Sequence, residues 1–175
     1  MTSKMDAINQ YDLDDLNLMD EWETEAKDSS EDSLDLEGVS MNCANLKKRC
    51  NSFMNITNSE LRLSDFERAN MIGAKIALSD LHGSNFHNTN LEYSEIEKCD
   101  FSCSDLSGAN LQGATIEKSN FRWTDLRGAK LSNCRIRDVD FWGATYNLDT
   151  ILPFEQEIAR KLGMVLSFPH IHSAS

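Results

Sequence analysis

Sizeable apolar side chains recur at every fifth position from Ile56 to Tyr146, and the register never shifts. An α-helix repeats its apolar face every 3.6 residues and a β-strand every second residue, so neither element alone produces this pattern. A fixed internal period is typical of proteins that stack one repeated unit on the next. We therefore predict a solenoid in which every five-residue unit sends one apolar side chain, its centre, into a common core.

The centres fall into groups of four, because isoleucine stands at every fourth centre and at no other, an interval of 20 residues. This interval predicts a four-sided coil. The first wall would hold Ile56, Ile76, Ile96, Ile116 and Ile136; the second Leu61, Leu81, Phe101, Phe121 and Phe141; the third Phe66, Phe86, Leu106, Leu126 and Tyr146; the fourth Met71, Leu91, Leu111 and Leu131. The isoleucines are thus expected to form one ladder along the core.

Two other positions of the unit also repeat. The residue two places before a centre is almost always small, as at Ser64 and Ala74, and the residue directly before a centre is Asp or Asn in most units. Glycine recurs two places after a centre, as at Gly73 and Gly143, where a corner with positive φ is easiest for glycine. The sequence contains no G-x-G-x-x-G or Walker pattern, so these glycines predict corners rather than phosphate-binding loops.

The register continues backwards from Ile56 through Leu46 and Met41 to Leu36, with only Asn51 interrupting it. We interpret the segment KKRCNS around Asn51 as an irregular side of the first coil, which would be a weaker cap. The repeat domain is predicted to span residues 34–148. It is preceded by a tail, residues 1–33, and followed by a C-terminal module, residues 149–175.

Negative charge is concentrated before the repeats. Residues 1–40 hold 13 acidic and 2 basic residues, a balance of −11, whereas the remainder holds 16 acidic and 15 basic residues, a balance of −1. Such a tail is expected to be disordered and solvated. Alternatively, Leu13, Leu16, Met19 and Trp22, spaced three apart, would lie on one side of a helix that folds into a partner's groove, or the tail would imitate a polyanion.

The C-terminal module carries the signals of a helix. Asp149 or Thr150 is expected near its start, Pro153 in its first turn and Gly163 at its end. The helix would have one apolar stripe, formed by Phe154, Ile158 and Leu162, and a short extended run, Met164–Leu166, would follow it. Two roles remain open for this module: a lid over the last coil, or a lid that also joins two copies.

Segments such as SDFERANMIGAKIALSDL and ANLQGATIEKSNFRWTDLRGAKL resemble the pentapeptide-repeat proteins, whose consensus is A(D/N)LXX. The resemblance implies an all-β solenoid: a right-handed, four-sided parallel β-helix with a C-terminal capping helix. The helix followed by LGMVL is similar to the C-terminal end of the quinolone-resistance (Qnr-type) and microcin-immunity members. In those proteins it is implied to make a two-fold dimer. We therefore predict a homodimer through Phe154, Ile158, Leu162 and Met164.

The sequence does not predict an enzyme. Catalysis needs convergent groups in a concave site, whereas repeated units make flat walls around a filled interior. His82 and His87 are expected to be exposed and unpartnered, Cys99 and Cys134 to point inward, and Cys103 to point outward. We predict no catalytic residue, no cofactor and no metal, a reduced cytoplasmic setting, and neither a membrane span nor direct contact with nucleic acid.

The outer walls suggest contact with a protein partner. The position before the centre carries acidic residues on the second wall (Glu60, Asp80, Asp100 and Asp140) and on the third (Asp65, Asp105 and Asp125). Rows of carboxylates about 4.8 Å apart could imitate a phosphate backbone, although Asp and Asn at this position would also hydrogen-bond the turns. Trp123 and Trp142 are expected in adjacent coils of the second wall, either against the C-terminal helix or in a partner-binding patch.

By resemblance to the Qnr-type and immunity proteins, the chain is predicted to act as a DNA mimic that binds DNA gyrase or topoisomerase IV and protects or modulates it. The alternative is an interaction scaffold, a delivered effector or an adaptor with no topoisomerase role. Its contacts would then be the tail and the two tryptophans.

Overall fold

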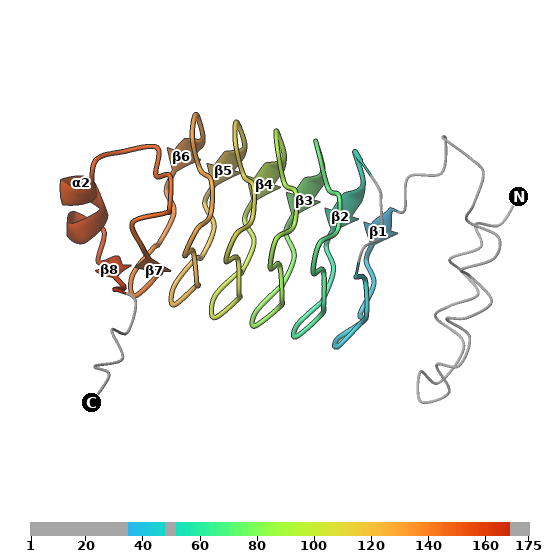
Figure 1. Ribbon diagram of the computed structural model, residues 1–175. Helices are drawn as coiled ribbons and strands as arrows, with labels where there is room; N and C mark the ends of the chain where they lie inside the picture. The colour runs from blue at the N-terminus through green and yellow to red at the C-terminus, as the bar shows by residue number, and fades with distance from the viewer. Residues whose placement is uncertain (1–34, 48–51, 169–175) are drawn as a thin grey trace, which may run out of the picture. The chain divides into compact units, whose positions relative to one another are not determined.

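The computed structural model describes residues 35–47 and 52–168. The predicted tail, with its alternative roles, and residues 48–51 of the irregular side lie outside the described residues. From residue 35 onwards the chain winds into a stack of similar coils that ends at a short helix (Figure 1).

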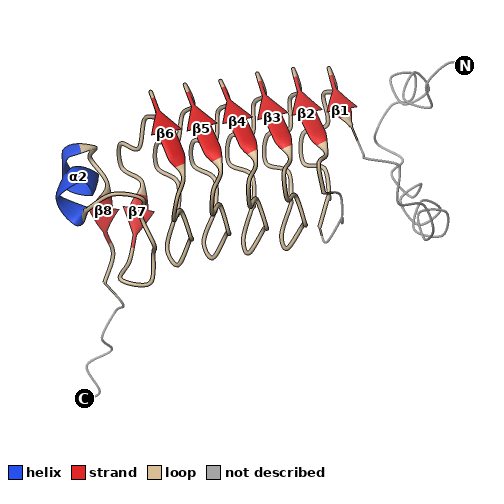
Figure 2. Cartoon of the chain, turned by 90° about the horizontal axis from the view of Figure 1, so that it is seen from above, coloured by secondary structure: helices blue, strands red, loops and turns tan. Residues whose placement is uncertain are grey.

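One wall of the stack is a parallel six-stranded sheet in which the strands follow in chain order. The strands are β1 (Leu36–Glu37), β2 (Asn55–Thr57), β3 (Lys75–Ala77), β4 (Glu95–Glu97), β5 (Thr115–Glu117) and β6 (Arg135–Arg137). Ile56 pairs with Ile76, and each following isoleucine pairs with the next one as far as Ile136. The other walls are joined by single bridges that have the same offset of 20 residues, such as Asp80 to Asp100, except for the last one, Lys130 to Ile151. The predicted parallel solenoid with four-unit coils is therefore confirmed (Figure 2).

The centres fill the interior as predicted. From Ile56 to Leu131, each one is at most 1% exposed to solvent. The rings of Phe66 and Phe86 stack with centroids 4.5 Å apart, and Phe101 lies 5.2 Å from Phe86 and 5.0 Å from Phe121. Burying such side chains provides most of the free energy that stabilises a fold of this kind.

Hydroxyl groups among the small residues are accommodated by the backbone. The Ser84 hydroxyl donates a hydrogen bond to the Leu61 carbonyl (2.8 Å), and the Ser104 hydroxyl donates to the Leu81 carbonyl (2.9 Å). Because a buried hydroxyl with a partner carries little desolvation penalty, serine can replace alanine at most of these positions; the buried Ser94 hydroxyl, which has no partner among the described residues, is an exception.

The corners two places after each centre are left-handed, but glycine is not required at all of them. Gly73 and Gly143 have φ of +67° and +74°, and residues as different as Leu78, Tyr93 and Trp123 have φ between +53° and +60° at equivalent places. The left-handed region disfavours side chains with a Cβ. Inter-coil hydrogen bonds at these corners, such as that from the Tyr93 amide to the Gln112 carbonyl (3.0 Å), hold the backbone in this conformation.

The predicted helix forms, but its predicted start is wrong. Helix α2 comprises only Gln156–Lys161 and begins after Glu155, so Pro153 is not in its first turn. The Thr150 hydroxyl donates to the Leu126 carbonyl (3.0 Å), and the Leu131 amide donates to the Ile151 carbonyl (2.7 Å). Residues 150 and 151 therefore extend the fourth wall, because the open coil edge competes with the helix for them. No helix in the described part of the chain is long and apolar enough to cross a membrane.

The chain returns to the solenoid after the helix. Strand β7 (Thr145–Tyr146) pairs in parallel with β8 (Val165–Leu166), and Tyr146 pairs with Leu166, again 20 residues later. Gly163 accepts a hydrogen bond from the Gly143 amide (2.9 Å), as a corner of the next coil would. Helix α2 thus replaces part of a further coil and covers part of one end of the stack (Figures 1 and 2).

Candidate functional surfaces

The structure brings the seven predicted acidic residues into the two expected rows. On the second wall, bridges connect Glu60 to Asp80, Asp80 to Asp100, and Asn120 to Asp140. On the third wall, Asp65 and Asp105 are both bridged to Asn85, and Asp105 is bridged to Asp125. Neighbouring coils place these side chains about 4.8 Å apart, the spacing on which the predicted mimicry of a phosphate backbone depends.

Basic side chains neutralise more than half of these carboxylates. Four ion pairs join Lys47 to Asp65 (2.9 Å), Arg62 to Asp80 (3.8 Å), Arg122 to Asp140 (3.1 Å) and Arg127 to Asp125 (2.5 Å). Among the residues that the structure describes, Glu60, Asp100 and Asp105 have no such partner. Exposed pairs add little stability, but they weaken the negative potential that a DNA mimic needs.

The carboxylates also have a local structural role. Asp80 accepts a hydrogen bond from the amide of His82 (3.0 Å), and Asp105 accepts one from the amide of Ser107 (2.8 Å), so each caps its own turn. Burial raises the pKa of Asp125, but the bonds from Arg127 outweigh this effect, and the pKa lies below its ordinary value. Turn formation alone therefore accounts for an Asp or Asn at this position.

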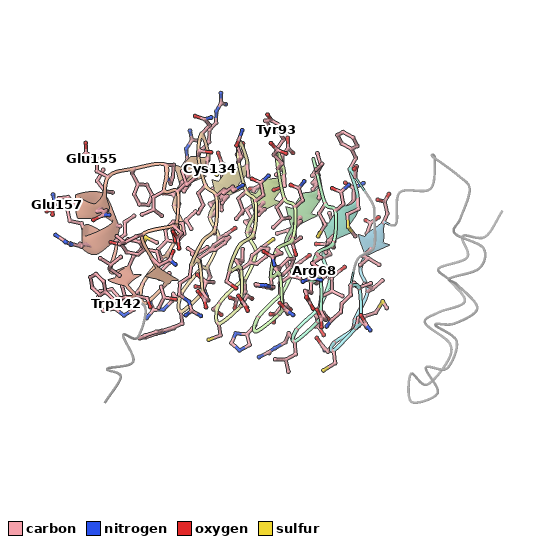
Figure 3. The ribbon with its side chains drawn as sticks, in the orientation of Figure 1. Arg68, Tyr93, Cys134, Trp142, Glu155 and Glu157 are labelled. Carbon is pink, nitrogen blue, oxygen red and sulfur yellow. The ribbon has the colours of Figure 1, made fainter. Side chains whose placement is uncertain are left out.

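The two tryptophans are exposed, at 58% for Trp123 and 54% for Trp142, and each also packs within the protein. The Trp123 ring occupies the space that a Cβ on Gly143 would fill, and the Trp142 ring does the same at Gly163. In Figure 3, Trp142 lies at the end of the stack that carries the helix, with Glu155 and Glu157. One signal in the sequence could have revealed this packing: a large side chain precedes a glycine by 20 residues at Phe53, Leu63, Tyr93 and Trp123.

An apolar groove lies between helix α2 and the last coil. It has a volume of about 610 Å³ and is lined by Ile136, Val139, Phe141, Phe154, Ile158 and Leu162, with Asp138 and Asp140. Three of the four predicted dimer residues, Phe154, Ile158 and Leu162, meet here. The fourth, Met164, is only 5% exposed and lies in the core, so it is not available to a second copy.

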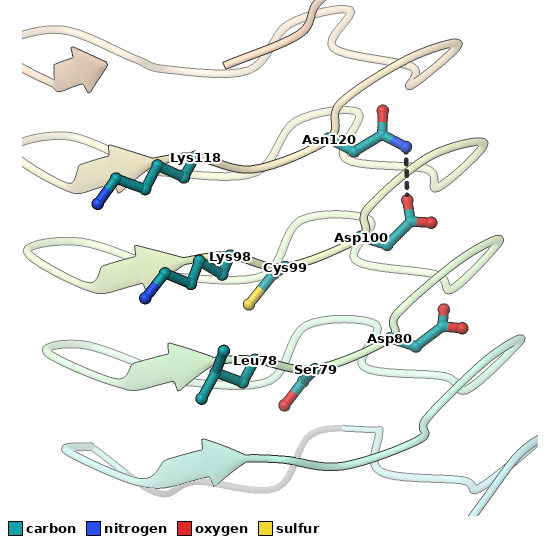
Figure 4. A pocket seen from close by; sticks show the side chains of 8 residues that line it. All are labelled: Leu78, Ser79, Asp80, Lys98, Cys99, Asp100, Lys118 and Asn120. Atoms are coloured by element: carbon teal, nitrogen blue, oxygen red, sulfur yellow. Dashed lines mark hydrogen bonds between the residues drawn. The ribbon is translucent and has the colours of Figure 1, made fainter. Parts of the chain in front are cut away.

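A second, shallower depression crosses three coils beside the second-wall row of carboxylates, which includes Asp80 (Figure 4). Its lining includes Lys98, Lys118, Cys99 and Asp100. Burial raises the pKa of the Cys99 thiol to about 11, although backbone hydrogen bonds oppose this shift. A thiol with this pKa is protonated at neutral pH and is a poor nucleophile, so the depression does not resemble a catalytic site.

The cysteines should therefore differ in reactivity. At pH 8, exposed Cys43 and Cys103 are expected to react with a thiol reagent in the folded protein, whereas Cys99 should react only after unfolding. Cys134, whose pKa burial also raises to about 11, should be slow. Mass spectrometry of labelled peptides before and after denaturation measures this order. Equal labelling of Cys99 and Cys103 in the folded protein would contradict the inward placement of Cys99.

The expectation of unpartnered histidines was wrong. His82 and His87 are half-buried, and their Nδ1 atoms lie 2.9 Å and 2.8 Å from the hydroxyls of Ser102 and Ser107. Each serine stands 20 residues after its histidine, so the stacking of coils creates the contact. Within residues 35–47 and 52–168, no group of three or more metal-ligating side chains comes together.

The family model described as pentapeptide repeats (8 copies) matches residues 64–102 and 104–143. The chain is a pentapeptide-repeat protein. This match covers the stacked phenylalanines and every carboxylate of the two rows except Glu60. Proteins of this family are typically non-catalytic structural or binding proteins. A search of curated proteins found no match.

Three examples represent the solved structures that are similar to this pentapeptide-repeat protein. Rfr23 from the cyanobacterium Cyanothece 51142 is 23% identical over 67% of this chain and 87% of its own, with a TM-score of 0.37. QnrB1, a plasmid-mediated fluoroquinolone resistance protein, is 14% identical over 76% of this chain and 91% of its own, with a TM-score of 0.43. HetL of Nostoc sp. strain PCC 7120, involved in the regulation of heterocyst differentiation, is 17% identical over 76% of this chain and 83% of its own, with a TM-score of 0.28.

Proposed function

We propose that this pentapeptide-repeat protein is a non-enzymatic scaffold that binds another protein. The observation that carries the proposal is the gathering of exposed apolar side chains towards the C-terminal end of the solenoid. They are Trp123, Trp142, Leu148, Ile151, Ile158, Val165 and Phe168, each at least 44% exposed. Exposed apolar and aromatic side chains at this density are typical of protein-binding surfaces.

A second candidate is DNA mimicry directed at DNA gyrase or topoisomerase IV. The two carboxylate rows favour it, and the resemblance of the sequence to the Qnr-type proteins suggests these enzymes as the partners to test. Glu60, Asp100 and Asp105 would supply most of its negative potential, because basic side chains pair with the other four acids. The near-neutral balance after residue 40 favours the scaffold over the mimic.

A gyrase supercoiling assay with and without a fluoroquinolone distinguishes the two candidates. The wild-type chain is compared with the double variant Asp100→Asn, Asp105→Asn. Asparagine caps the same turn in neighbouring units, as the Asn85 side chain does for the amide of His87 (2.9 Å), so the fold should persist. A mimic should lose on the order of tenfold in activity through the two charges, whereas a scaffold without a topoisomerase role should show no effect on gyrase with either chain.

The scaffold proposal can be tested by itself once a partner is known. Its binding should change little between low and high salt, since apolar burial is not screened as charges are, and Trp142→Ala should weaken binding on the order of tenfold or more. Tyr93→Ala is the matched control, because Tyr93 is 62% exposed and covers Gly113 as Trp142 covers Gly163. An equal loss in both variants would contradict a binding surface at the C-terminal end.

We also propose that two copies associate through Phe154, Ile158 and Leu162. Ile158 is 44% exposed although it belongs to the apolar stripe of α2, so Ile158→Lys should convert a dimer into a monomer with little loss of stability. Light scattering at micromolar concentration measures the mass, and Leu78→Lys, at another exposed apolar side chain, is the control. A wild-type chain that is monomeric at this concentration would contradict the proposal.

A further inference from the structure

The sheet that runs through the first wall ends at β6 with an open edge. In the preceding coil, the Lys118 amide donates to the Arg137 carbonyl (2.9 Å), and the Ala114 carbonyl accepts from the Arg135 amide (2.9 Å). The equivalent groups one coil later are the Asp138 amide and the Cys134 carbonyl. Neither has a backbone partner among the described residues. The edge therefore has a free donor and a free acceptor where every earlier coil bonds its successor.

The open edge continues around the next corner. Earlier coils join there through the Asp140 amide, which donates to the Ser119 carbonyl (3.1 Å), and through the Phe121 amide, which donates to the Asp140 carbonyl (2.8 Å). The equivalent Val139 carbonyl and Phe141 amide have no backbone partner in the part of the chain that the structure describes. Four unpaired backbone groups, from residue 134 to residue 141, thus follow one another along this edge.

The apolar groove lies along the same edge. Ile136 is half-buried, whereas the other four isoleucines of the ladder are at most 1% exposed, because no next strand covers it. Helix α2 lines the groove with Ile158 and Leu162, and Phe154 lies near Phe141, with ring centroids 6.5 Å apart. An added strand would therefore find an apolar surface on its inner side and backbone partners along its length.

The charged side chains beside the edge indicate which sequence an added strand would have. In the register of this sheet, a residue stacked on Ile136 points inward, and the residues on either side of it lie next to Arg135 and Arg137. Arg137 is 72% exposed and forms only a loose pair with Glu117 (3.6 Å), while Arg135 has no ion pair with a described residue. Opposite charges on adjacent strands stabilise a sheet. Asp140, farther along, already pairs with Arg122.

We propose that the edge of β6 and the adjoining groove bind an extended segment of a partner protein in which one aliphatic residue stands between two acidic residues. The segment adds a strand to the sheet, its backbone bonding the free groups of residues 134–141. Its aliphatic side chain covers Ile136, and its carboxylates pair with Arg135 and Arg137. Strand β4 of this same sheet, Glu95–Ile96–Glu97, shows that the pattern fits the wall.

A second copy is a poorer occupant of the edge itself. If two copies paired β6 with β6 about a two-fold axis centred on Ile136, Arg135 of one strand would face Arg137 of the other, and like charges in this position are destabilising. The proposal does not depend on the function proposed above. The bound segment and a second copy would compete for Phe154, Ile158 and Leu162, however, so segment binding should dissociate any dimer that uses them.

The test uses the full chain and a short, acetylated, fluorescent peptide with Glu-Ile-Glu at its centre. Fluorescence anisotropy should show saturable binding that weakens in high salt. Arg135→Glu with Arg137→Glu should lower the affinity on the order of tenfold or more and should favour a Lys-Ile-Lys peptide instead. Arg62→Glu with Arg68→Glu, an equal change of charge at exposed side chains in earlier coils, should leave the affinity for the Glu-Ile-Glu peptide within about twofold.

A peptide methylated on the backbone nitrogen of its first glutamate separates strand addition from simple charge attraction. It keeps both carboxylates but loses the amide that would donate to the Cys134 carbonyl, as the Arg135 amide donates to the Ala114 carbonyl, so it should bind at least about tenfold more weakly. Three results would overturn the proposal: no binding of the Glu-Ile-Glu peptide up to about 1 mM, equal binding of the methylated peptide, or an equal effect of the two pairs of arginine variants. Loss of affinity for one peptide with gain for the other shows that the Arg135, Arg137 variant is folded.

Discussion

Phe101→Ala is expected to lower the free energy of unfolding by about 3–5 kcal/mol. The Phe101 side chain is fully buried, and its ring lies between Phe86 and Phe121, with centroids 5.2 Å and 5.0 Å away. Truncation removes the apolar burial of one ring and leaves a cavity inside a stack whose neighbouring rings are held by other coils. The loss exceeds that of a typical single substitution, because few cores can collapse around a missing aromatic ring.

Urea unfolding followed by circular dichroism measures this change. Leu78→Ala is the matched control, since Leu78 is 53% exposed at a corner, and it should change stability by no more than about 0.5 kcal/mol. If Phe101→Ala cost no more than this control, the continuous aromatic stack would not be what holds the middle coils together.

Gly143→Ala is expected to destabilise the protein by about 2–5 kcal/mol, from two separate causes. Gly143 has φ of +74°, and an alanine held in the left-handed region costs about 1–2 kcal/mol. Its Cβ would also overlap the Trp123 ring, which occupies that space, and overpacking of this kind costs about 1–3 kcal/mol. The same corner connects to Gly163, so the C-terminal cap should loosen with it.

Three further variants separate the causes: Gly128→Ala, Trp123→Ala, and the double variant Trp123→Ala, Gly143→Ala. Gly128 has φ of +70°, but a Cβ there would meet nothing closer than 3.8 Å, so Gly128→Ala should show the backbone cost of about 1–2 kcal/mol alone. In a Trp123→Ala background, Gly143→Ala should cost no more than Gly128→Ala, because the overlap is gone. Thermal unfolding of the four variants gives the coupling. An unchanged cost of Gly143→Ala without Trp123 would show that the ring does not restrict this corner.

The central fold could be predicted from residue spacing because each unit repeats the same physical requirement. A buried centre such as Ile56, a small residue before it and a turn-forming Asp or Asn determine one side of the coil, and the interval between isoleucines determines its size. Contacts between coils then follow automatically within the repeats, since nearly every residue there lies beside the one 20 positions away. The expectation for His82, which lies beside Ser102, failed because this same relation was not applied to exposed residues. The packing of Trp123 over Gly143 could have been predicted from the same relation.

The ends were less predictable, because there local preference competes with the open edge of the last coil. Asp149, Thr150 and Pro153 are good residues for the start of a helix, yet Ile151 pairs with the fourth wall, and the helix begins five residues after it. The return of Val165 and Leu166 to the third wall could have been found by extending the 20-residue register past Tyr146.

The sequence by itself determined the period, the four walls, the core and the family, since all of these follow from the identity and spacing of side chains along the chain. Only the tertiary structure decided which surfaces remain open. Four basic side chains pair with acids in the two rows: Lys47, Arg62, Arg122 and Arg127. This pairing depends on the conformations of long side chains on the surface of the coils. The burial of Met164 and the unpaired edge at β6 depend on how the chain leaves the stack and rejoins it. Spacing along the chain could predict where the chain rejoins the stack, but it carries no information about the edge that stays unpaired, because that edge arises where the repeat is broken.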